Sequence, residues 1–379
     1  GEGFNEANKA KQSVWLRNYR ELPIQSLTRY GTLSLLHLRD VPKRVERLGV
    51  RKVYEGHRLL VRRGVPEGGE LTSNFDSRPF CFRNSIIGVR LLGFEPWQEK
   101  TLLGLLWSSL VRYYLFLTAG SWGMWHDEIQ VEAVESLPVC FPKDNSLRHR
   151  LVRVVEELQK LDLQLGGLEL FGSAAPRRLP ELERELNDAV FDLYGLSESE
   201  RDLVREMCLL GLDLFYRDHE SDAAKPLALP SQRWGTYSDV AHSDSGLNAY
   251  LRTFLQVWNA ELEPDGELAW RILSPPSGAP LLAVSFVTRF KNKPVVPPPD
   301  GNGEAWAKLL KKLEKDARLP AGSSSVFTDT FFRLIGEREM VFIKRNEARF
   351  WTRTSAREDA EAALVRLMHK EDIGRKEGK

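Results

Sequence analysis

The sequence is poor in cysteine and has no long apolar run. Its three cysteines, Cys81, Cys140 and Cys208, lie far apart and form no Cys-x-x-Cys pair, so neither a disulfide framework nor a zinc knuckle is expected. The longest apolar stretch, Thr101–Leu117, contains Arg112 and falls short of the roughly 18 to 20 residues that a membrane span needs. We therefore expect a cytoplasmic protein without a membrane segment, in which this stretch forms a buried helix.

The usual motifs of catalytic sites are also missing. There is no Gly-x-Ser-x-Gly elbow, no phosphate-binding loop and no helical pair of zinc-binding histidines. Gly301–Gly303 has no preceding strand and no third glycine, so it indicates a turn. Two acidic pairs, Asp265 with Glu267 and Asp300 with Glu304, lack the lysine that a nuclease site would place two residues further along a strand. We expect no catalytic centre, metal or cofactor in this chain.

Charge is scarce in total but unevenly distributed. The formal net charge is +1, yet residues 1–150 carry 22 Lys and Arg against 16 Asp and Glu, residues 151–230 carry 9 against 17, and residues 231–379 carry 23 against 20. Residues 1–70 alone carry 14 against 8. Phosphate binding needs a local basic surface rather than a basic protein. The first part could supply that surface, although ordinary solvated charges would give the same counts.

The first 145 residues predict a strand-rich domain with a central helix. The β-branched and basic run Arg58–Val65 predicts a strand that ends at the turn cluster Pro66–Gly69, and Phe80–Leu92 predicts an antiparallel neighbour in a small mixed sheet. Trp97–Leu117 is a helix by length and composition, and it is apolar on more than one face. Glu128–Cys140 is expected to be extended.

Residues 146–217 change to helical periodicity. Apolar residues at helical spacing line Leu151–Leu161 and Leu182–Leu193, and Gly195 is a C-terminal cap for the second of these helices. A capping box at Ser197–Glu200 opens a third helix. These acidic, amphipathic helices predict a packing unit.

The remaining sequence predicts a linker and a second domain. Residues 218–245 are rich in Asp, Ser, Ala and Pro, as linkers are, and residues 246–379 then alternate helix and strand patterns. The expected elements are helices at Gly246–Leu262, Glu304–Ala317 and Ala356–His369 (the last opened by a capping box at Ser355–Glu358), and strands at Leu268–Leu273, Leu281–Phe290, Val326–Ile335 and Met340–Trp351, the last two joined by a hairpin turn. The predicted class is α+β: a small mixed or antiparallel sheet with a helical bundle, followed by a separate α+β domain.

Candidate binding residues concentrate in the strands and loops of the first part. Arg62 and Arg63 are consecutive in a strand, so one of them should face outward. Arginine can bond a guanine edge, asparagine an adenine edge, and aromatic loop residues can stack on bases or wedge between them. The candidate DNA contacts are Arg62, Arg63, Arg78, Arg83, Asn84, Trp122 and His126. Alternatively, the tryptophans pack under the loop, the arginines solvate an edge strand, and His126–Glu128 is a plain polar loop.

The order of segments resembles a known family more than any single residue does. In chain order the segments are strand-rich residues 52–92, Leu103–Tyr114, Gly120–Gly123, Leu137-Pro138 and Tyr194-Gly195-Leu196. This arrangement is similar to the C-terminal target-recognition region of adenine-N6 DNA methyltransferases from restriction–modification systems, especially the fused methylase–nuclease class. Where that family has a Leu-Leu-Asn-Ser motif, this chain has Trp107-Ser108-Ser109. The similarity covers approximately residues 50–210.

The resemblance implies a DNA-reading role without chemistry. Such regions lie across from the catalytic domain, grip the major groove and help to expose the target adenine. The methyl-donor loop and the Asp/Asn-Pro-Pro-aromatic motif, which act on the flipped base, lie upstream in the family and are absent here. The implied partners are double-stranded DNA and a methyltransferase catalytic domain, in cis or in trans, that would bind S-adenosylmethionine.

Two other interpretations stay open at this point. The acidic residues 151–230 and the near-neutral total charge also fit a non-catalytic protein-interaction subunit of a phage-defence assembly. A nuclease with its site in residues 246–379 would require metal-dependent chemistry at Asp265 or Asp300.

Overall fold

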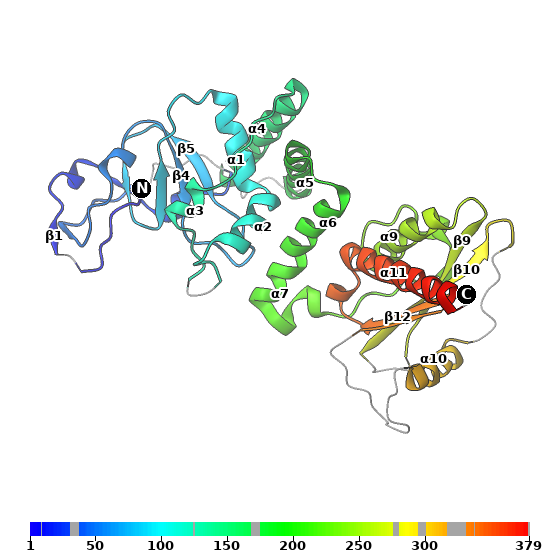
Figure 1. Cartoon of the computed structure of the whole chain (residues 1–379). Coiled ribbons are helices and arrows are strands. Elements are labelled where there is room, and N and C mark those ends of the chain that lie inside the picture. Colours follow the sequence, from blue (N-terminus) through cyan, green and yellow to red (C-terminus); the bar gives the residue numbers. More distant parts are fainter. Residues whose placement is uncertain are drawn as a thin grey trace. The chain divides into compact units, whose positions relative to one another are not determined.

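The chain divides into two compact units, Gly1–Leu212 and Asp213–Lys379 (Figure 1). The computed structural model describes residues 1–8, 10–30, 38–123, 126–167, 175–275, 280–294, 301–316, 331–336 and 338–377. Helices and mostly antiparallel strands occur in both units, which confirms the predicted α+β class.

A three-stranded antiparallel sheet is the centre of the first unit. Strand β4 (Arg58–Arg62) lies between β5 (Ser73–Asp76) and β7 (Ile86–Val89). Leu59 and Val61 of β4 face the core that the helices share, and Leu60 faces a second core on the opposite side. The predicted strand at Arg58–Val65 is therefore confirmed, with an end three residues earlier than expected. Phe80–Leu92 is split by a turn at Asn84–Ser85.

Short strands build the N-terminal part of this unit. Strand β1 (Lys11–Gln12) pairs antiparallel with β3 (Arg44–Val45), and β2 (Glu21–Leu22) pairs parallel with β6 (Cys81–Phe82). Single turns of 3-10 helix lie between these strands at Leu16–Asn18, Ile24–Ser26 and Arg51–Val53. The second core fills the space among them and includes Phe4, Leu16, Val45, Tyr54, Cys81 and Phe82.

The prediction of a single helix at Trp97–Leu117 is wrong. The segment forms α1 (Pro96–Trp107) and α2 (Ser109–Thr118), which are bent by 62°. Ser108 causes the break, because its backbone is extended and its hydroxyl accepts a hydrogen bond from the N–H of Val111 at 3.3 Å. By itself, no helix in the described part of the chain is long and apolar enough to cross a membrane; only α1 and α2, counted together across their bend, reach that length and apolarity.

The extended structure predicted at Glu128–Cys140 is interrupted by α3 (Val131–Glu135). Val131, Ala133 and Val134 pack against the first core from this helix. Packing therefore decides the local conformation here, and α3 ends at Glu135, before Pro138.

The helices predicted after residue 145 are confirmed. Gly195 ends the second of them with a φ of 67°, and the capping box of Ser197 and Glu200 opens the third. They are α4 (Asn145–Gly167), α5 (Ala175–Tyr194) and α6 (Glu198–Glu206), followed by a π-helical turn (Met207–Gly211) and α7 (Leu212–Arg217).

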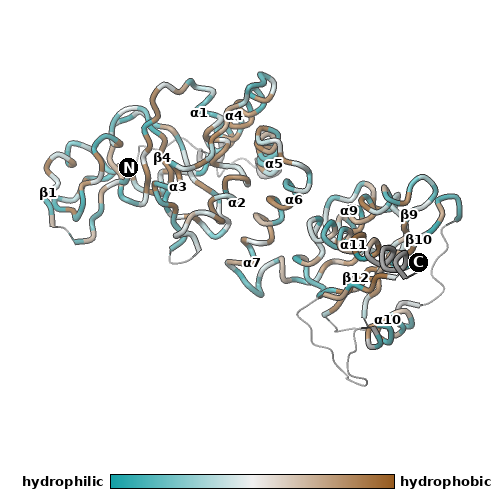
Figure 2. Tube along the Cα trace, viewed as in Figure 1, coloured by the Kyte–Doolittle hydropathy of each residue, from teal (hydrophilic) through white to brown (hydrophobic). Residues whose placement is uncertain are grey.

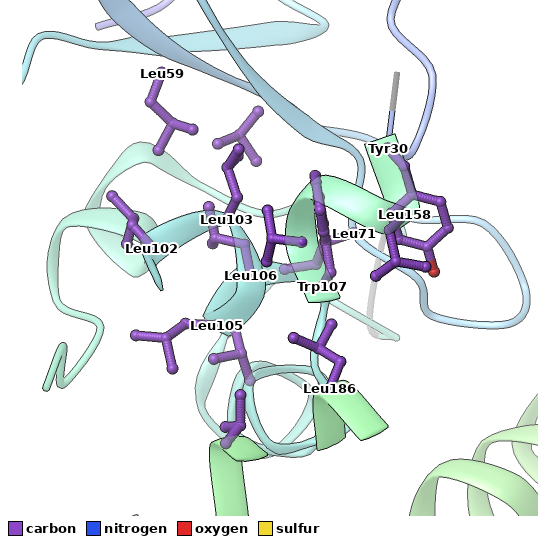
Figure 3. Packing of buried hydrophobic residues seen from close by; sticks show 14 of the residues in the cluster. Tyr30, Leu59, Leu71, Leu102, Leu103, Leu105, Leu106, Trp107, Leu158 and Leu186 are labelled. Atoms are coloured by element: carbon purple, nitrogen blue, oxygen red, sulfur yellow. The ribbon is translucent and has the colours of Figure 1, made fainter. Parts of the chain in front are cut away.

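One core joins the sheet to these helices. Figure 3 shows α1 residues, Leu102 and Leu103 among them, lying between Leu59 of β4 and Leu158 of α4 and Leu186 of α5. Residues 1–145 and 146–212 therefore share this core, which is one of two cores in the first unit.

The second unit is a five-stranded antiparallel sheet with helices on both faces. Figure 1 shows α9 (Gly246–Glu261) and α11 (Arg353–Glu377) on one side of the sheet and α10 (Asn302–Asp316) on the other. Val284, Phe286 and Phe342 pack in the core with α9 and α11, whereas Val341 and Ile343 pack against α10. Hydrophobic stretches run along the inner strands in Figure 2. The strand order is β11 (Phe332–Ile335), β12 (Glu339–Arg345), β10 (Leu281–Phe290), β9 (Gly266–Leu273) and β8 (Trp234–Gly235).

Most predicted elements of this unit are confirmed, with two differences. The stretch expected to be a linker, 218–245, contains β8 and α8 (Tyr237–Val240), and β8 pairs with β9. The last helix begins before its expected cap, because the hydroxyl of Thr352 accepts from the N–H of Ser355 at 3.2 Å. The predicted strand residues 326–330 lie outside the described residues.

Candidate nucleic-acid interface

A frame of backbone hydrogen bonds at the end of β4 brings five predicted residues together. The N–H of Arg63 donates to the carbonyl of Ser85 at 2.8 Å, which places the turn containing Arg83 and Asn84 beside the strand end. On the other side, the N–H of Ile129 donates to the carbonyl of Arg63 at 2.9 Å. The loop that carries His126 is therefore fixed against the same strand end.

Arg63 is neutralised at this site. Its guanidinium lies 3.0 Å from a carboxylate oxygen of Glu2 and 3.1 Å from one of Glu128, and it donates to Gln130 at 3.0 Å. Its side chain is only 16% exposed. A DNA phosphate would have to displace Glu2, Glu128 and Gln130 from Arg63. Arg63 therefore mainly links the sheet to the loop that precedes α3.

Arg83 and Arg78 are also ion-paired. Arg83 lies 2.7 Å from Glu21 and 2.8 Å from Glu6, and the hydrogen bond to Glu21 raises the pKa of Arg83. Arg78 donates from Nε to Asp76 at 3.0 Å. Arg78 lies near the start of β4, about 13 Å of strand length from Arg62, and so is not part of the cluster.

Trp122 lies in the core instead of on the loop surface. It is 3% exposed and makes an edge-to-face contact with Phe116, with ring centroids 5.5 Å apart. The alternative in which this tryptophan packs under its loop describes the structure better than base stacking does. The neighbouring Trp125 lies outside the described residues.

Three of the predicted DNA contacts have side chains that are available to bind a ligand. Within the described ranges no side-chain hydrogen bond or ion pair engages Arg62, Asn84 or His126, and His126 is exposed. Arg62 shares the face of Leu60, opposite to that of Arg63, and its Nε is buried without an acceptor among the residues that the structure describes.

A polar pocket that the sequence did not reveal lies beside α1. It has a volume of about 570 Å³ and is lined by Asn74, Phe75, Glu99, Lys100, Leu103, Glu156, Gln159 and Lys160. At its rim, His57 bonds Ser77 at 2.7 Å and Glu99 at 2.8 Å, while its ring stacks on Phe75. Burial lowers the pKa of Lys100, which donates to Gln159.

A histidine between a hydroxyl and a carboxylate is an arrangement that can activate a nucleophile. Here, however, the neighbouring N–H of Arg78, which could stabilise an oxyanion, donates to Asp76 at 2.7 Å. The chain of bonds through His57 instead links the start of β4 to α1. No signal in the sequence indicated this link, because its members are 20 and 42 residues apart.

A second buried polar cluster lies in the second unit. Asp359 is fully buried and accepts from Lys344 at 2.5 Å, from Arg333 at 2.8 Å and from the hydroxyl of Tyr250 at 2.7 Å. Burial raises the pKa of Tyr250 and lowers that of Lys344. Because Asp359 lies on α11 and Lys344 lies on β12, the cluster fastens α11 to the sheet, and Lys344 also donates to the carbonyl of Phe350 at 3.0 Å.

The acidic pairs considered for a nuclease do not form a metal centre in the part that is described. Glu267 pairs with Arg289 at 2.6 Å, and Asp300 lies outside the described residues. Among the residues whose positions are given, no three His, Cys, Asp or Glu side chains gather as a metal site requires.

No family model matches the chain, and no curated protein matches it.

Proposed function

We propose that this chain is a sequence-specific DNA-recognition segment of an adenine-N6 DNA methyltransferase or restriction–modification protein. Double-stranded DNA would be its ligand, in the cytoplasm, and a catalytic domain in cis or in trans would bind S-adenosylmethionine. The supporting observation is the end of β4, where Arg62, Asn84 and His126 share one rigid frame and have uncommitted side chains.

The proposed division of labour follows from these side chains. Arg62 can donate to a guanine edge and Asn84 can pair with an adenine edge, each worth about 1–3 kcal/mol of discrimination. His126, exposed on the adjoining loop, is positioned for a phosphate or a base edge. Arg63 and its carboxylates hold this surface in place.

The test is selection from a library of duplexes with a randomised core, using the full chain. We expect the wild type to enrich one motif, and Arg62→Ala and Asn84→Ala each to relax one position of it. Overall affinity for mixed-sequence duplex should change much less, because base contacts supply specificity and not the bulk of the binding.

Arg366→Ala is the matched control, since Arg366 is exposed in the second unit and should leave the motif unchanged. Enrichment of no motif by the wild type would contradict the proposal. An unaltered motif in both strand-end variants would show that recognition lies elsewhere.

A further inference from the structure

Residues 10–30 and 38–52 form a basic lobe on the first unit. This segment, which contains β1, β2 and β3, carries ten Lys and Arg against three Asp and Glu, a net charge of +7 in a chain whose total is +1. One of its three acids, Glu21, is buried and pairs with Arg83 outside the lobe. Hydrophilic residues predominate around β1 in Figure 2.

Half of the ten cations of the basic lobe are exposed and uncommitted, whereas Arg20, Arg29 and Arg47 are ion-paired. Five side chains are exposed and have no ion pair or hydrogen bond with any residue that the structure describes: Lys11, Arg17, Arg39, Lys43 and Lys52. This contrasts with Arg63 and Arg83 at the strand end, each of which has two carboxylate partners. A phosphate can bind to the lobe without displacing a protein carboxylate.

The backbone of the basic lobe is held in place beneath these charges. The N–H of Ser13 donates to the carbonyl of Lys43 at 3.1 Å, and Arg44 donates to the carbonyl of Ala10 at 3.1 Å. Val45 is fully buried, and the guanidinium of Arg51 lies 5.7 Å from the ring centroid of Trp15. Lys11 and Lys43 therefore project from a paired ribbon, which fixes their spacing before a ligand arrives.

We propose that the basic lobe is a phosphate-binding surface that clamps the backbone of duplex DNA while the end of β4 contacts the bases. The inference rests on the proposed function, and it assigns most of the nonspecific affinity to residues outside the seven candidates drawn from the sequence. Duplex DNA fits because its phosphates recur along both strands and can meet several fixed cations together.

The experiment measures how the affinity of the full chain for a mixed-sequence 30-base-pair duplex depends on KCl concentration, by fluorescence anisotropy. Replacing Lys11, Lys43 and Lys52 together by Gln should reduce the slope of log affinity against log salt by about 2 to 3, since each lost phosphate contact removes about 0.9. Lys311→Gln, Lys315→Gln and Arg366→Gln, combined, remove the same charge from exposed positions of the second unit and should leave the slope unchanged.

Three results would overturn the inference. They are an unchanged salt slope in the lobe variant, an equal reduction of the slope in the control variant, or a lobe variant that loses more affinity for single-stranded RNA than for the duplex. The first leaves the proposed function intact if the wild type still enriches a motif. Failure of the wild type to bind duplex at all would reject both.

Discussion

The end of β4 and the basic lobe both contain several arginines and lysines, yet they differ in how many of these charges are available. At the strand end, Glu2, Glu6, Glu21 and Glu128 neutralise Arg63 and Arg83. In the lobe, Lys11, Lys43 and Lys52 have no such partner within the described residues. Whether a cation is free to bind phosphate therefore depends on which acids the fold brings to it, and these can be more than 60 residues away.

The basic lobe can hold its charges at fixed positions only if it stays packed on the sheet. Thiol labelling tests this packing, and of the predictions made here it has the largest expected effect. Cys81 is fully buried in the core that joins β6 to the lobe, whereas Cys140 is exposed. We expect iodoacetamide to modify Cys140 at least about 10³ times faster than Cys81 in the native chain, because Cys81 reacts only after local opening. Peptide mass spectrometry gives both rates, and the lobe variant should keep the ratio.

The same thiol gives the pH dependence of this packing. Burial raises the pKa of Cys81 from 9.0 to about 12. The folded state holds the thiol proton of Cys81 more tightly than the unfolded state does. The contribution of this protonated thiol to the free energy of unfolding is therefore complete below pH 9.0 and is lost as the pH rises toward about 12. Comparable labelling of Cys81 and Cys140 near neutral pH would contradict the packing of the lobe.

Two substitutions in one loop sharpen the description of the strand end. Trp122→Ala should lower the free energy of unfolding by about 3–5 kcal/mol, because it removes a large buried side chain. His126→Ala, four residues further on, should cost under about 0.5 kcal/mol, because His126 is exposed. Urea titration measures both. If the Trp122→Ala protein had normal stability but no longer bound DNA, Trp122 would contact the DNA and would not be a core residue.

Local patterns in the sequence predicted the elements better than the partners. Helical spacing, Gly195 and the capping box at Ser197 were sufficient to predict α4 to α6, because these signals act within a few residues. The break at Ser108 was not predicted, because the residues on both sides of it are apolar and only the hydroxyl of this one serine caps the new helix. The pairing of Arg63 with Glu2 and Glu128 could not be predicted, because it depends on how distant segments meet around β4.

Removing those acids should make the strand end resemble the lobe. In the double variant Glu2→Gln and Glu128→Gln, Arg63 loses two charged partners while remaining 16% exposed, so stability should fall by about 1–3 kcal/mol. The released guanidinium of Arg63, together with Arg47, which also loses its partner Glu2, should bind mixed-sequence duplex more tightly and increase the salt slope by about 1 to 2. Glu132→Gln with Glu135→Gln removes equal charge from exposed positions, and equal behaviour of the two double variants would contradict the neutralising role of Glu2 and Glu128.

The smallest effect is expected at Arg78, which tests whether position along β4 matters. Its ion pair with Asp76 leaves the arginine 44% exposed, so Arg78→Ala should change stability by less than about 1 kcal/mol. Because Arg78 lies at the opposite end of the strand from Arg62, the motif enriched from the duplex library should stay the same. If Arg78→Ala relaxed the motif and Arg62→Ala did not, the base-contacting surface would lie at the start of β4, beside the pocket of His57 and Glu99, and the free side chains at the other end would have no part in recognition.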